Sequence, residues 1–380
     1  DEALEYIDKV LAIDPTYIYA LNNRAVVLYD LKKYDEAIQY YDKALAIDPK
    51  YVDALKNKAI VLKDLKRYDE ALQYYDKVLA IGTNDVNALY NKANIFEILK
   101  ENDDALKYYN KALSIDPTNL NLLNGKANTL KNLHRNDEAI QYFDKVLKID
   151  PSASYALNNK ALVLQDLQRY DEALQYYEKA LSIDPKFIYA LYNKANTLQY
   201  LQRYDEALQY YEKALSIDSS NVNVLNGKAY ALQQQHRYDE ALQYYDKALS
   251  IDPTYFNALN NKANVLKDLK RYNEALQYYD KALAIEPAHV NALNNKANVL
   301  ANLNKNEEAL PLVQKALESD SNNEYHLNTA ALIMYNVGNY DDAKSYFEKA
   351  LQINANLTEL LTEKELTVFN KLMNNTTTKK

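Results

Sequence analysis

The chain has 380 residues and a formal net charge of −8, with 48% apolar residues, 4 Gly, 37 Tyr and neither Cys nor Trp. Without Cys it can form no disulfide, thiolate metal site or cysteine nucleophile, and it fits a reducing compartment, so we expect a cytoplasmic protein. The charges are spread along the chain, which excludes the basic patch of a nucleic-acid-binding protein, and no apolar run is long enough to span a membrane.

Residues 1–17 predict a single amphipathic helix. Their sequence, which starts DEALEYIDKVLAIDP, matches the second half of the units that follow. We therefore interpret 1–17 as a partial repeat that supplies a second helix only. Its apolar residues Leu4, Ile7 and Leu11 need a covering surface, and we expect either an upstream repeat or self-association through this uncapped helix to provide one.

Residues 18–357 are built from one pattern that recurs every 34 residues. The motif IDP, or a close variant, places its Asp-like residue at position 14, then at 48 and 82, and so on to 354 without an insertion. Ten full units therefore start at residues 18, 52, 86, 120, 154, 188, 222, 256, 290 and 324. Such self-similarity is typical of a solenoid in which each unit packs on its neighbours.

Each unit predicts two helices joined by a turn. In the unit that starts at residue 256, Leu259, Ala263 and Leu266 share one helical stripe, and Ala275 and Tyr279 share a second stripe after a break at KRY. The Asp or Asn of the YD or YN pair at this break is predicted to cap the second helix. Neither helix can bury its stripe alone, so the units must stack.

The chain is predicted to end with a helix that belongs to no unit. Residues 358–373 are interpreted as one amphipathic capping helix, which covers the apolar face of the last unit as the end of a solenoid requires. Residues 374–380, NNTTTKK, are predicted to be a disordered tail.

Small and aromatic residues recur at fixed places in the units. The first small site holds Ala25, Ala59, Ala93, Ala127, Ala161, Ala195, Ala229, Ala263, Ala297 and Ala331. The second small site holds Ala37, Ala71, Ala105, Ala139, Ala173, Ala207, Ala241, Ala275, Ala309 and Ala343. The aromatic site holds Tyr41, Tyr75, Tyr109, Phe143, Tyr177, Tyr211, Tyr245, Tyr279 and Phe347.

With these residues the chain resembles the tetratricopeptide repeat (TPR) family from residue 1 to about residue 357. The resemblance implies an all-α fold, a right-handed α-solenoid superhelix of 34-residue helix-turn-helix repeats. It also implies that the first helix of each unit lines the concave surface of the superhelix.

Two features depart from the family pattern. Pro311 lies inside a predicted second helix, so we expect a late start or a kink there. A Lys falls on the buried stripe of most first helices, and we predict a packed aliphatic stem whose ammonium group reaches a carboxylate. These lysines are Lys58, Lys92, Lys126, Lys160, Lys194, Lys228, Lys262 and Lys296.

Asparagines recur on the face of the first helix opposite the buried stripe. Counting the first residue of a unit as position 1, the second, fifth, sixth and ninth positions lie on this open face, with Tyr interleaved. The fifth position carries Asn22, Asn124, Asn158, Asn226, Asn260, Asn294 and Asn328. The predicted peptide-binding residues are Asn23, Asn57, Asn91, Asn94, Asn128, Asn159, Asn193, Asn196, Asn261, Asn264, Asn295, Asn298, Tyr192 and Tyr230.

The asparagines allow two interpretations. A side-chain amide matches the donors and acceptor of a peptide group, so a ladder of amides can hold an extended chain. Superhelical members of the family that bind extended peptides carry similar ladders. Alternatively, the amides form a solvated face or set the geometry between helices. Gly125, Gly227 and Thr329 interrupt the sixth-position ladder, which favours binding in segments.

The sequence therefore predicts a non-catalytic scaffold that binds an extended or disordered segment of another protein. We find no phosphate-binding loop, no Ser/His/Asp grouping and no metal-ligand spacing among the four His, so we expect no cofactor, no nucleic acid and no membrane partner. Two alternatives remain open. The chain is either a structural spacer or self-assembling rod, or the substrate-recruiting arm of an enzyme whose catalytic domain lies outside it.

Overall fold

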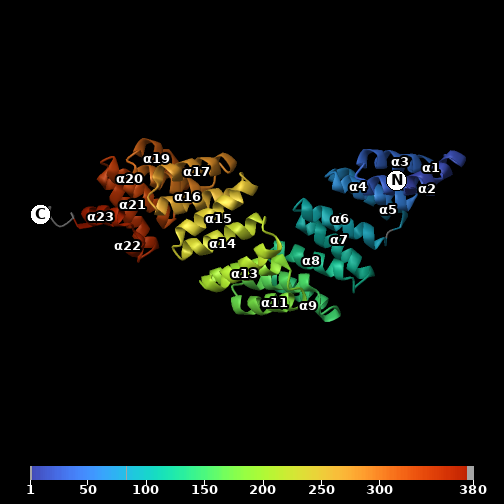
Figure 1. The fold of residues 1–380 in the computed structure, drawn as a ribbon, viewed down its shortest axis with the longest axis horizontal. Helices are drawn as coiled ribbons and strands as arrows, with labels where there is room; N and C mark the ends of the chain where they lie inside the picture. Colours follow the sequence, from blue (N-terminus) through green and yellow to red (C-terminus); the bar gives the residue numbers. More distant parts are fainter. Residues whose placement is uncertain (1, 83, 375–380) are drawn as a thin grey trace. The chain divides into compact units, whose positions relative to one another are not determined.

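The computed structural model describes residues 2–82 and 84–374 of the chain (Figure 1). These residues form 23 helices and no strand, which confirms the all-α fold class. None of the helices in this part of the chain is long and apolar enough to cross a membrane. The helices divide into two compact units, Asp1–Ala190 and Leu191–Lys380, and the division falls inside α12 (Ile188–Tyr200).

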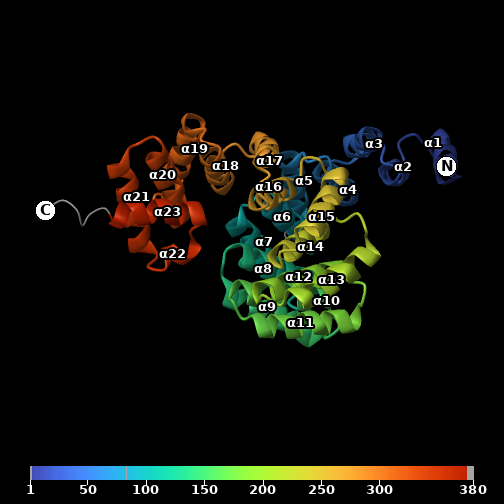
Figure 2. The ribbon, with the colours of Figure 1, turned by 60° about the vertical axis from the view of Figure 1, so that its left-hand side comes forward.

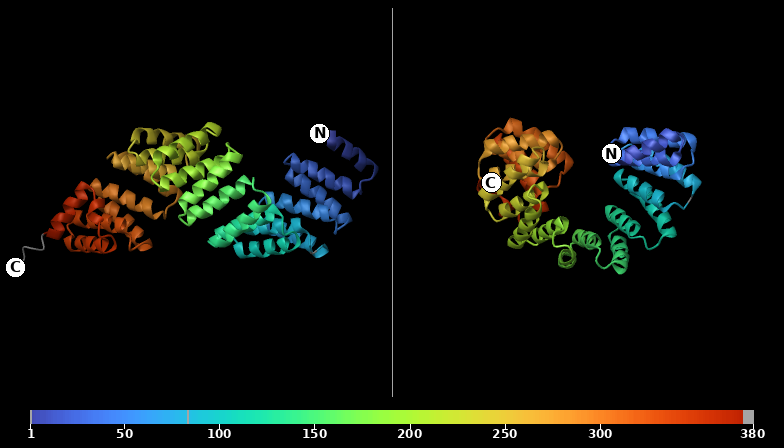
Figure 3. Two further views of the ribbon diagram at one scale, coloured as in Figure 1. Left: turned by 90° about the horizontal axis from the view of Figure 1, so that it is seen from below. Right: turned by 45° about the vertical axis from the view of Figure 1, so that its right-hand side comes forward.

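Helix pairs follow one another in chain order within each unit (Figures 2 and 3). The first unit starts with α1 (Glu2–Ile13) and then has the pairs α2 (Ile18–Asp30) and α3 (Tyr34–Ile47), α4 (Val52–Asp64) and α5 (Tyr68–Ile81), α6 (Val86–Ile98) and α7 (Asn102–Ile115), α8 (Leu120–Asn132) and α9 (Asn136–Ile149), and α10 (Ser154–Asp166) and α11 (Tyr170–Ile183). Each first helix thus starts at the residue where the repeat pattern starts.

The second unit continues the same arrangement. After α12 it contains α13 (Tyr204–Ile217), α14 (Val222–Gln234) and α15 (Tyr238–Ile251), α16 (Phe256–Asp268) and α17 (Tyr272–Ile285), α18 (Val290–Asn302) and α19 (Asn306–Ser319), α20 (Glu324–Asn336) and α21 (Tyr340–Ile353), and finally α22 (Leu357–Leu360) and α23 (Glu363–Asn374). From α2 to α11 in the first unit and from α13 to α21 in the second, each helix packs on the next, both within a pair and between adjacent pairs.

The small and aromatic positions form the core of both units. Ala263 and Ala275 of one pair are fully buried, and so is the ring of Tyr279 between them and the next pair. Small residues let the helices approach closely, and the aromatic ring fills the remaining space. The same sites are buried in the other pairs, which explains why the sequence repeats them.

The turn inside each pair differs from the prediction. The second helix α5 starts at Tyr68 with Arg67 as N-cap residue, and no side chain caps it, so the predicted cap by Asp69 is wrong. The reason is that Lys66 takes a left-handed conformation, with φ of 61°, so that the helix starts two residues earlier than a cap at Asp69 would place it. Asp69 and Glu70 instead lie in the first turn, where they favour the helix dipole, and Arg67 holds Glu70 through two hydrogen bonds of 2.6 and 2.7 Å.

The prediction for the buried lysines is confirmed in six of the first helices. Lys58, Lys92, Lys160, Lys228, Lys262 and Lys296 each form an ion pair with an Asp or Glu 16 residues earlier. Lys262, for example, pairs with Asp246 on α15 and donates a 2.7 Å hydrogen bond to the hydroxyl group of Tyr278 on α17. A single ammonium group thereby joins the second helices of adjacent repeats.

Helix α19 starts at Asn306, in register with the other second helices, although it contains Pro311. The expected late start is therefore wrong. The start is set by the preceding turn, where Asn304 has a φ of 59° and Lys305 is the N-cap residue, as in the other pairs.

The last segment forms two helices, α22 and α23, rather than the single helix predicted for 358–373. Leu361 and Thr362 separate them, and Thr362 starts α23 with a capping box, because its main-chain N–H and hydroxyl donate to Glu365 at 2.8 and 2.7 Å. Helix α23 packs against α20 and α21, and Phe369 meets Phe347 edge to face at 5.3 Å. Asn374 ends α23, and the rest of the predicted tail lies outside the described residues.

Candidate functional site

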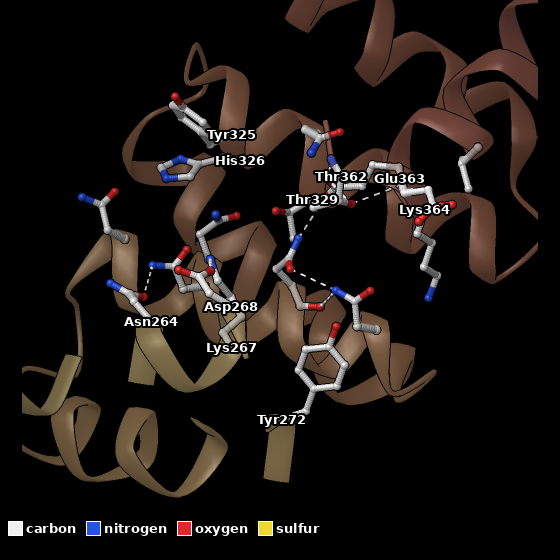
Figure 4. Close-up of a pocket in the computed structure, with 18 of the residues that line it drawn as sticks. Asn264, Lys267, Asp268, Tyr272, Tyr325, His326, Thr329, Thr362, Glu363 and Lys364 are labelled. Carbon is white, nitrogen blue, oxygen red and sulfur yellow. Dashed lines mark hydrogen bonds and ion pairs between the residues drawn. The ribbon is translucent and has the colours of Figure 1, made fainter. Parts of the chain in front are cut away.

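The second unit contains a pocket of about 1220 Å³ (Figure 4). Its walls come from the first helices α16, α18 and α20 and from α23. Seven asparagines of the first helices line it, Asn260, Asn264, Asn291, Asn294, Asn295, Asn298 and Asn328, and Asn302 and Asn323 lie at their ends. The seven occupy the second, fifth, sixth or ninth positions of their units.

Charged and aromatic side chains complete the pocket. Lys267 and Asp268 stand at the end of α16, with Nζ and Oδ1 3.8 Å apart, while Lys364 and Lys371 come from α23. Burial raises the pKa of Asp268, and the charges of Lys267 and His236 oppose this shift. The ring of Tyr325 lies at the edge of the pocket and is more than half exposed.

Asn264 and Asn295 are joined to each other and to the core. The Nδ2 atom of Asn295 on α18 donates to Oδ1 of Asn264 on α16 at 3.0 Å. The same Oδ1 accepts a 2.6 Å hydrogen bond from the hydroxyl group of the buried Tyr279. These predicted site residues therefore line the pocket and also link adjacent repeats.

Asn298 connects α18 to the C-terminal helix. Its Nδ2 donates to Oε1 of Glu365 at 3.1 Å, and its Oδ1 accepts from Asn302 at 3.1 Å. Glu365 is only 4% exposed, and Thr362 supplies its other hydrogen bonds. Helix α23 thereby closes one end of the pocket.

The fifth-position asparagines of the pocket have different surroundings. The Oδ1 atoms of Asn260, Asn294 and Asn328 are buried and accept no hydrogen bond. They lie on the successive first helices α16, α18 and α20, one repeat apart. The peptide-binding residues predicted from the sequence do not include these three asparagines, although the fifth position lies on the same face of the first helix.

His326 is a further pocket residue that sequence reasoning missed. It is buried on α20, and its Nδ1 lies 3.4 Å from the main-chain oxygen of Asp320. Burial lowers the pKa of His326, and the hydrogen bond to the Asp320 carbonyl opposes this shift. His326 lies near the polar start of α20, and the sequence around it does not predict that its side chain is buried.

The remaining predicted residues of the second unit lie away from this pocket. Asn261 donates to Oδ1 of Asn226 on α14 at 3.3 Å, and Asn196 accepts from the hydroxyl group of Tyr211 at 2.5 Å. Asn193 and Tyr192 are partly buried on α12, and Tyr230 on α14 is 40% exposed.

In the first unit the predicted residues form links of the same kind. Asn57 donates to Asn22 at 3.2 Å, Asn159 donates to Asn128 at 3.1 Å, and Asn94 accepts from a core tyrosine at 2.6 Å. Asn91 donates to a main-chain carbonyl of its own helix at 2.9 Å. Asn23 is exposed on α2.

The two glycines that interrupt the ladder have a packing reason. A Cβ atom on Gly125 would lie 2.5 Å from the ring of Tyr109, and one on Gly227 would lie 2.8 Å from the ring of Tyr211. In both places a Tyr at the fifth position of the preceding repeat, Tyr90 or Tyr192, has its ring centroid 6.3 Å from the same core Tyr. A side chain at the sixth position would displace this aromatic pair.

The described residues contain no group of three or more His, Cys, Asp or Glu that could hold a metal ion. Amides, phenols, two imidazoles and seven charged side chains line the pocket. A side-chain amide offers two N–H donors and an acceptor oxygen, so it can pair with both the carbonyl and the N–H group of a peptide main chain.

The paired helices, the buried Ala and Tyr sites and the polar face define an all-α solenoid of helix-turn-helix repeats. Family models described as tetratricopeptide repeat match residues 16–84, 86–119, 118–186, 152–220, 187–254, 220–285, 254–320 and 327–357. The chain belongs to the tetratricopeptide repeat family. No curated protein matches it.

Solved structures resemble the chain at low sequence identity. One is the APC/C hetero-tetramer Cut9–Hcn1, with 17% identity and a TM-score of 0.59 over 94% of this chain and 76% of that chain. Another is a tetratricopeptide repeat protein from Parabacteroides merdae, with 20% identity and a TM-score of 0.55 over 62% of this chain and 93% of that chain. A third is YrrB, described as a TPR protein with an unusual peptide-binding site. It has 24% identity and a TM-score of 0.43 over 50% of this chain and 98% of that chain. The first two likenesses show the shared fold.

Proposed function

We propose that the chain is a non-catalytic interaction scaffold whose pocket on α16, α18, α20 and α23 binds an extended segment of a partner protein. Membership of the tetratricopeptide repeat family is consistent with such a scaffold. The observation that carries the proposal is the composition of the pocket, in which nine asparagines from three successive first helices and their ends surround one volume.

The size and chemistry of the pocket support a peptide over a small molecule. Its volume of about 1220 Å³ exceeds the ~300–1,000 Å³ of most small-molecule sites, and nearly all of its lining residues carry a polar group, whereas most residues that line such sites are apolar. Neutral amides bind main-chain groups of any sequence at about 0.5–1.5 kcal/mol for each net hydrogen bond. Several such bonds would give micromolar affinity after the cost of association.

The charges lining the pocket give the ligand a weak preference. The pocket is lined by four lysines, Lys267, Lys270, Lys364 and Lys371, and by three acidic residues, Asp268, Glu363 and Glu365. Glu365 accepts hydrogen bonds from Asn298 and Thr362. The walls are therefore slightly cationic although the whole chain has a net charge of −8. We expect segments with one or two acidic residues to bind better than basic ones.

A selection from a library of random 12-residue peptides, run on the full chain, tests the proposal. Asn291 on α18 is exposed and lines the pocket, whereas Asn257 occupies the same position on α16 outside the pocket. Asn291→Trp should therefore obstruct the pocket, and Asn257→Trp is the matched control. Peptides that bind the parent and the control but not Asn291→Trp support the proposal. Failure to select any peptide, or equal binding to all three proteins, would contradict it.

A further inference from the structure

Three tyrosine rings meet at the start of α2 and α4 in the first unit. The ring centroids of Tyr17 and Tyr19 are 5.5 Å apart, and those of Tyr19 and Tyr51 are 5.7 Å apart at an interplanar angle of 76°. Tyr17 is 45% exposed and Tyr19 is 54% exposed. We call these three residues the aromatic patch. Large side chains that contact one another and still face water are typical of recognition surfaces.

Two of these tyrosines occupy positions where a capping residue would stabilise a helix. Tyr17 and Tyr51 are the N-cap residues of α2 and α4, and neither side chain forms a cap hydrogen bond. At the same position of the next two first helices, Asp85 and Asn119 each accept a hydrogen bond from a main-chain N–H, as N-cap residues usually do. Helices α2 and α4 therefore lack this hydrogen bond and present an aromatic ring instead, and such departures from local preference are typical of functional positions.

A carboxylate lies beside the rings. Asp53 is in the first turn of α4, two residues after Tyr51, and its side chain is 64% exposed. Burial raises the pKa of the Tyr51 hydroxyl group, and the charge of the nearby Asp53 raises it further. The ammonium group of Lys56 is 4.0 Å from Asp53 but only 3.2 Å from Asp85. The negative charge of Asp53 is therefore only partly compensated within the chain.

Other tyrosines of the chain show which group such rings hold. The ammonium groups of Lys58 and Lys77 lie 4.5 and 4.4 Å from the ring centroid of Tyr74 on α5. Equivalent tyrosines of later second helices hold lysines in the same way. A cation is attracted to the face of an aromatic ring by the quadrupole of the ring. Within the part of the chain that the structure describes, no cation–π contact involves the aromatic patch, so its exposed rings are open to a cation of another molecule.

We propose that the aromatic patch and Asp53 form a second binding site, which holds an arginine side chain of a partner protein. The exposed rings supply faces on which the guanidinium group stacks, and the Asp53 carboxylate supplies the opposite charge. Arginine fits this combination better than lysine, because its planar group can stack on a ring and donate to a carboxylate at the same time. The site lies in the first unit and is independent of the pocket in the second unit.

The start of α10 and α12 has the same aromatic arrangement without the charge. The ring centroid of Phe187 is 4.9 Å from that of Tyr155 and 6.0 Å from that of Tyr189. Tyr155 occupies the position in its unit that Tyr19 occupies in the first, and Tyr189 stands where the equivalent unit has Asp53. This uncharged aromatic cluster offers ring faces without the carboxylate, so it provides a matched control for the role of the charge.

Selection of peptides with the pocket obstructed tests the proposal. The target is the full chain carrying Asn291→Trp, and the probe is the tightest peptide from a library of random 12-residue peptides. We expect this peptide to contain an arginine. Replacing that arginine with citrulline, which has nearly the same shape but no charge, should weaken binding about tenfold.

Two further variants in the same background locate the site. Tyr19→Leu and Asp53→Asn should each weaken binding of the arginine peptide by about threefold or more. Asp53→Asn should leave binding of the citrulline peptide unchanged, because only the charged side chain pairs with the carboxylate. The matched controls are Tyr155→Leu, in the uncharged aromatic cluster, and Asp35→Asn, at an exposed site in the first turn of α3. Both controls should bind the arginine peptide as tightly as the Asn291→Trp protein does.

Each result decides the proposal. Selection of no peptide, equal binding of the arginine and citrulline peptides, or equal losses in the variants and their controls would overturn it. The function proposed for the pocket is tested separately, because peptides for the pocket bind Asn257→Trp and not Asn291→Trp, whereas peptides for the aromatic patch bind both.

Discussion

The hydroxyl group of Tyr279 donates a 2.6 Å hydrogen bond to Oδ1 of Asn264, so a core residue of α17 is tied to the open face of α16. Asn264 in turn accepts from Asn295 on the next first helix. A ninth-position Asn therefore serves packing and pocket together, which explains why helices that would be more stable with Ala carry Asn there.

Replacing Tyr279 with Phe should destabilise the second unit by about 1 kcal/mol, because the partly buried Asn264 loses a donor. Tyr75 provides a matched control, since its hydroxyl group is buried and makes no hydrogen bond. Tyr75→Phe should be neutral or slightly stabilising. Urea unfolding followed by circular dichroism measures both variants, and an equal loss of stability in the two would refute this role of the Tyr279 hydroxyl.

Asn110 breaks the pattern of acidic partners for the buried lysines. Lys126 donates to Oδ1 of Asn110 and to the hydroxyl group of Tyr142, both at 2.5 Å, whereas equivalent lysines pair with Asp or Glu. Burial raises the pKa of Tyr142, but the hydrogen bond and charge of Lys126 outweigh this effect and lower it overall.

Asn110→Asp should therefore stabilise the first unit by about 0.2–1 kcal/mol at pH 7, as expected for a partly exposed ion pair. The gain should be complete above about pH 5 and should be lost as the pH falls through the lowered pKa of the paired carboxylate. Melting temperatures of the parent and the variant at pH 7 and at about pH 2 check this. A gain that is undiminished at the acid pH would show that the new charge is not its cause.

Gln168 lies in the turn between α10 and α11 with a φ of 58°, in the left-handed region that costs a residue with a Cβ atom about 1–2 kcal/mol. Gln168→Gly should stabilise the chain by about 0.5–1 kcal/mol, because the relief of strain exceeds the extra entropy of the unfolded Gly. The control is Gln141→Gly, at an exposed site inside α9, which should destabilise by about 1 kcal/mol. Thermal unfolding of the two variants should therefore shift in opposite directions.

His326 should make the second unit sensitive to acid. Burial lowers the pKa of His326 below its ordinary value of 6.5, so the folded state favours the neutral imidazole. Its contribution to stability is complete above pH 6.5 and is lost as the pH falls through the lowered pKa. His326→Gln should reduce the loss of stability between pH 7.5 and pH 5.5, whereas His134→Gln in the exposed turn after α8 should keep the parent's profile. Urea unfolding at both pH values provides the comparison, and identical profiles for all three proteins would contradict it.

The repeat pattern predicted the helices and their core well because each first helix starts where the pattern starts. The turns were harder, since Lys66, Gln168 and similar residues adopt the left-handed conformation without the Gly that usually indicates it. The start of α23 did have a signal, because Thr362 and Glu365 form a capping box, but the apolar pattern around it suggested one continuous helix.

The open face of the first helices could be placed from helical spacing, but the pocket could not. The pocket depends on the contact between Asn298 and Glu365, which are 67 residues apart. Local patterns do not show a contact between residues so far apart in the sequence.

Hydrogen–deuterium exchange of the full chain, measured with and without a 12-residue peptide selected for the pocket, tests the central claim most directly. Binding in the pocket should slow exchange in α16, α18, α20 and α23, because the peptide stabilises these helices against local opening. Helices α2 to α8 of the first unit should exchange at unchanged rates. Protection confined to the first unit, or to the exposed helix α1, would contradict the assignment of the site to this pocket.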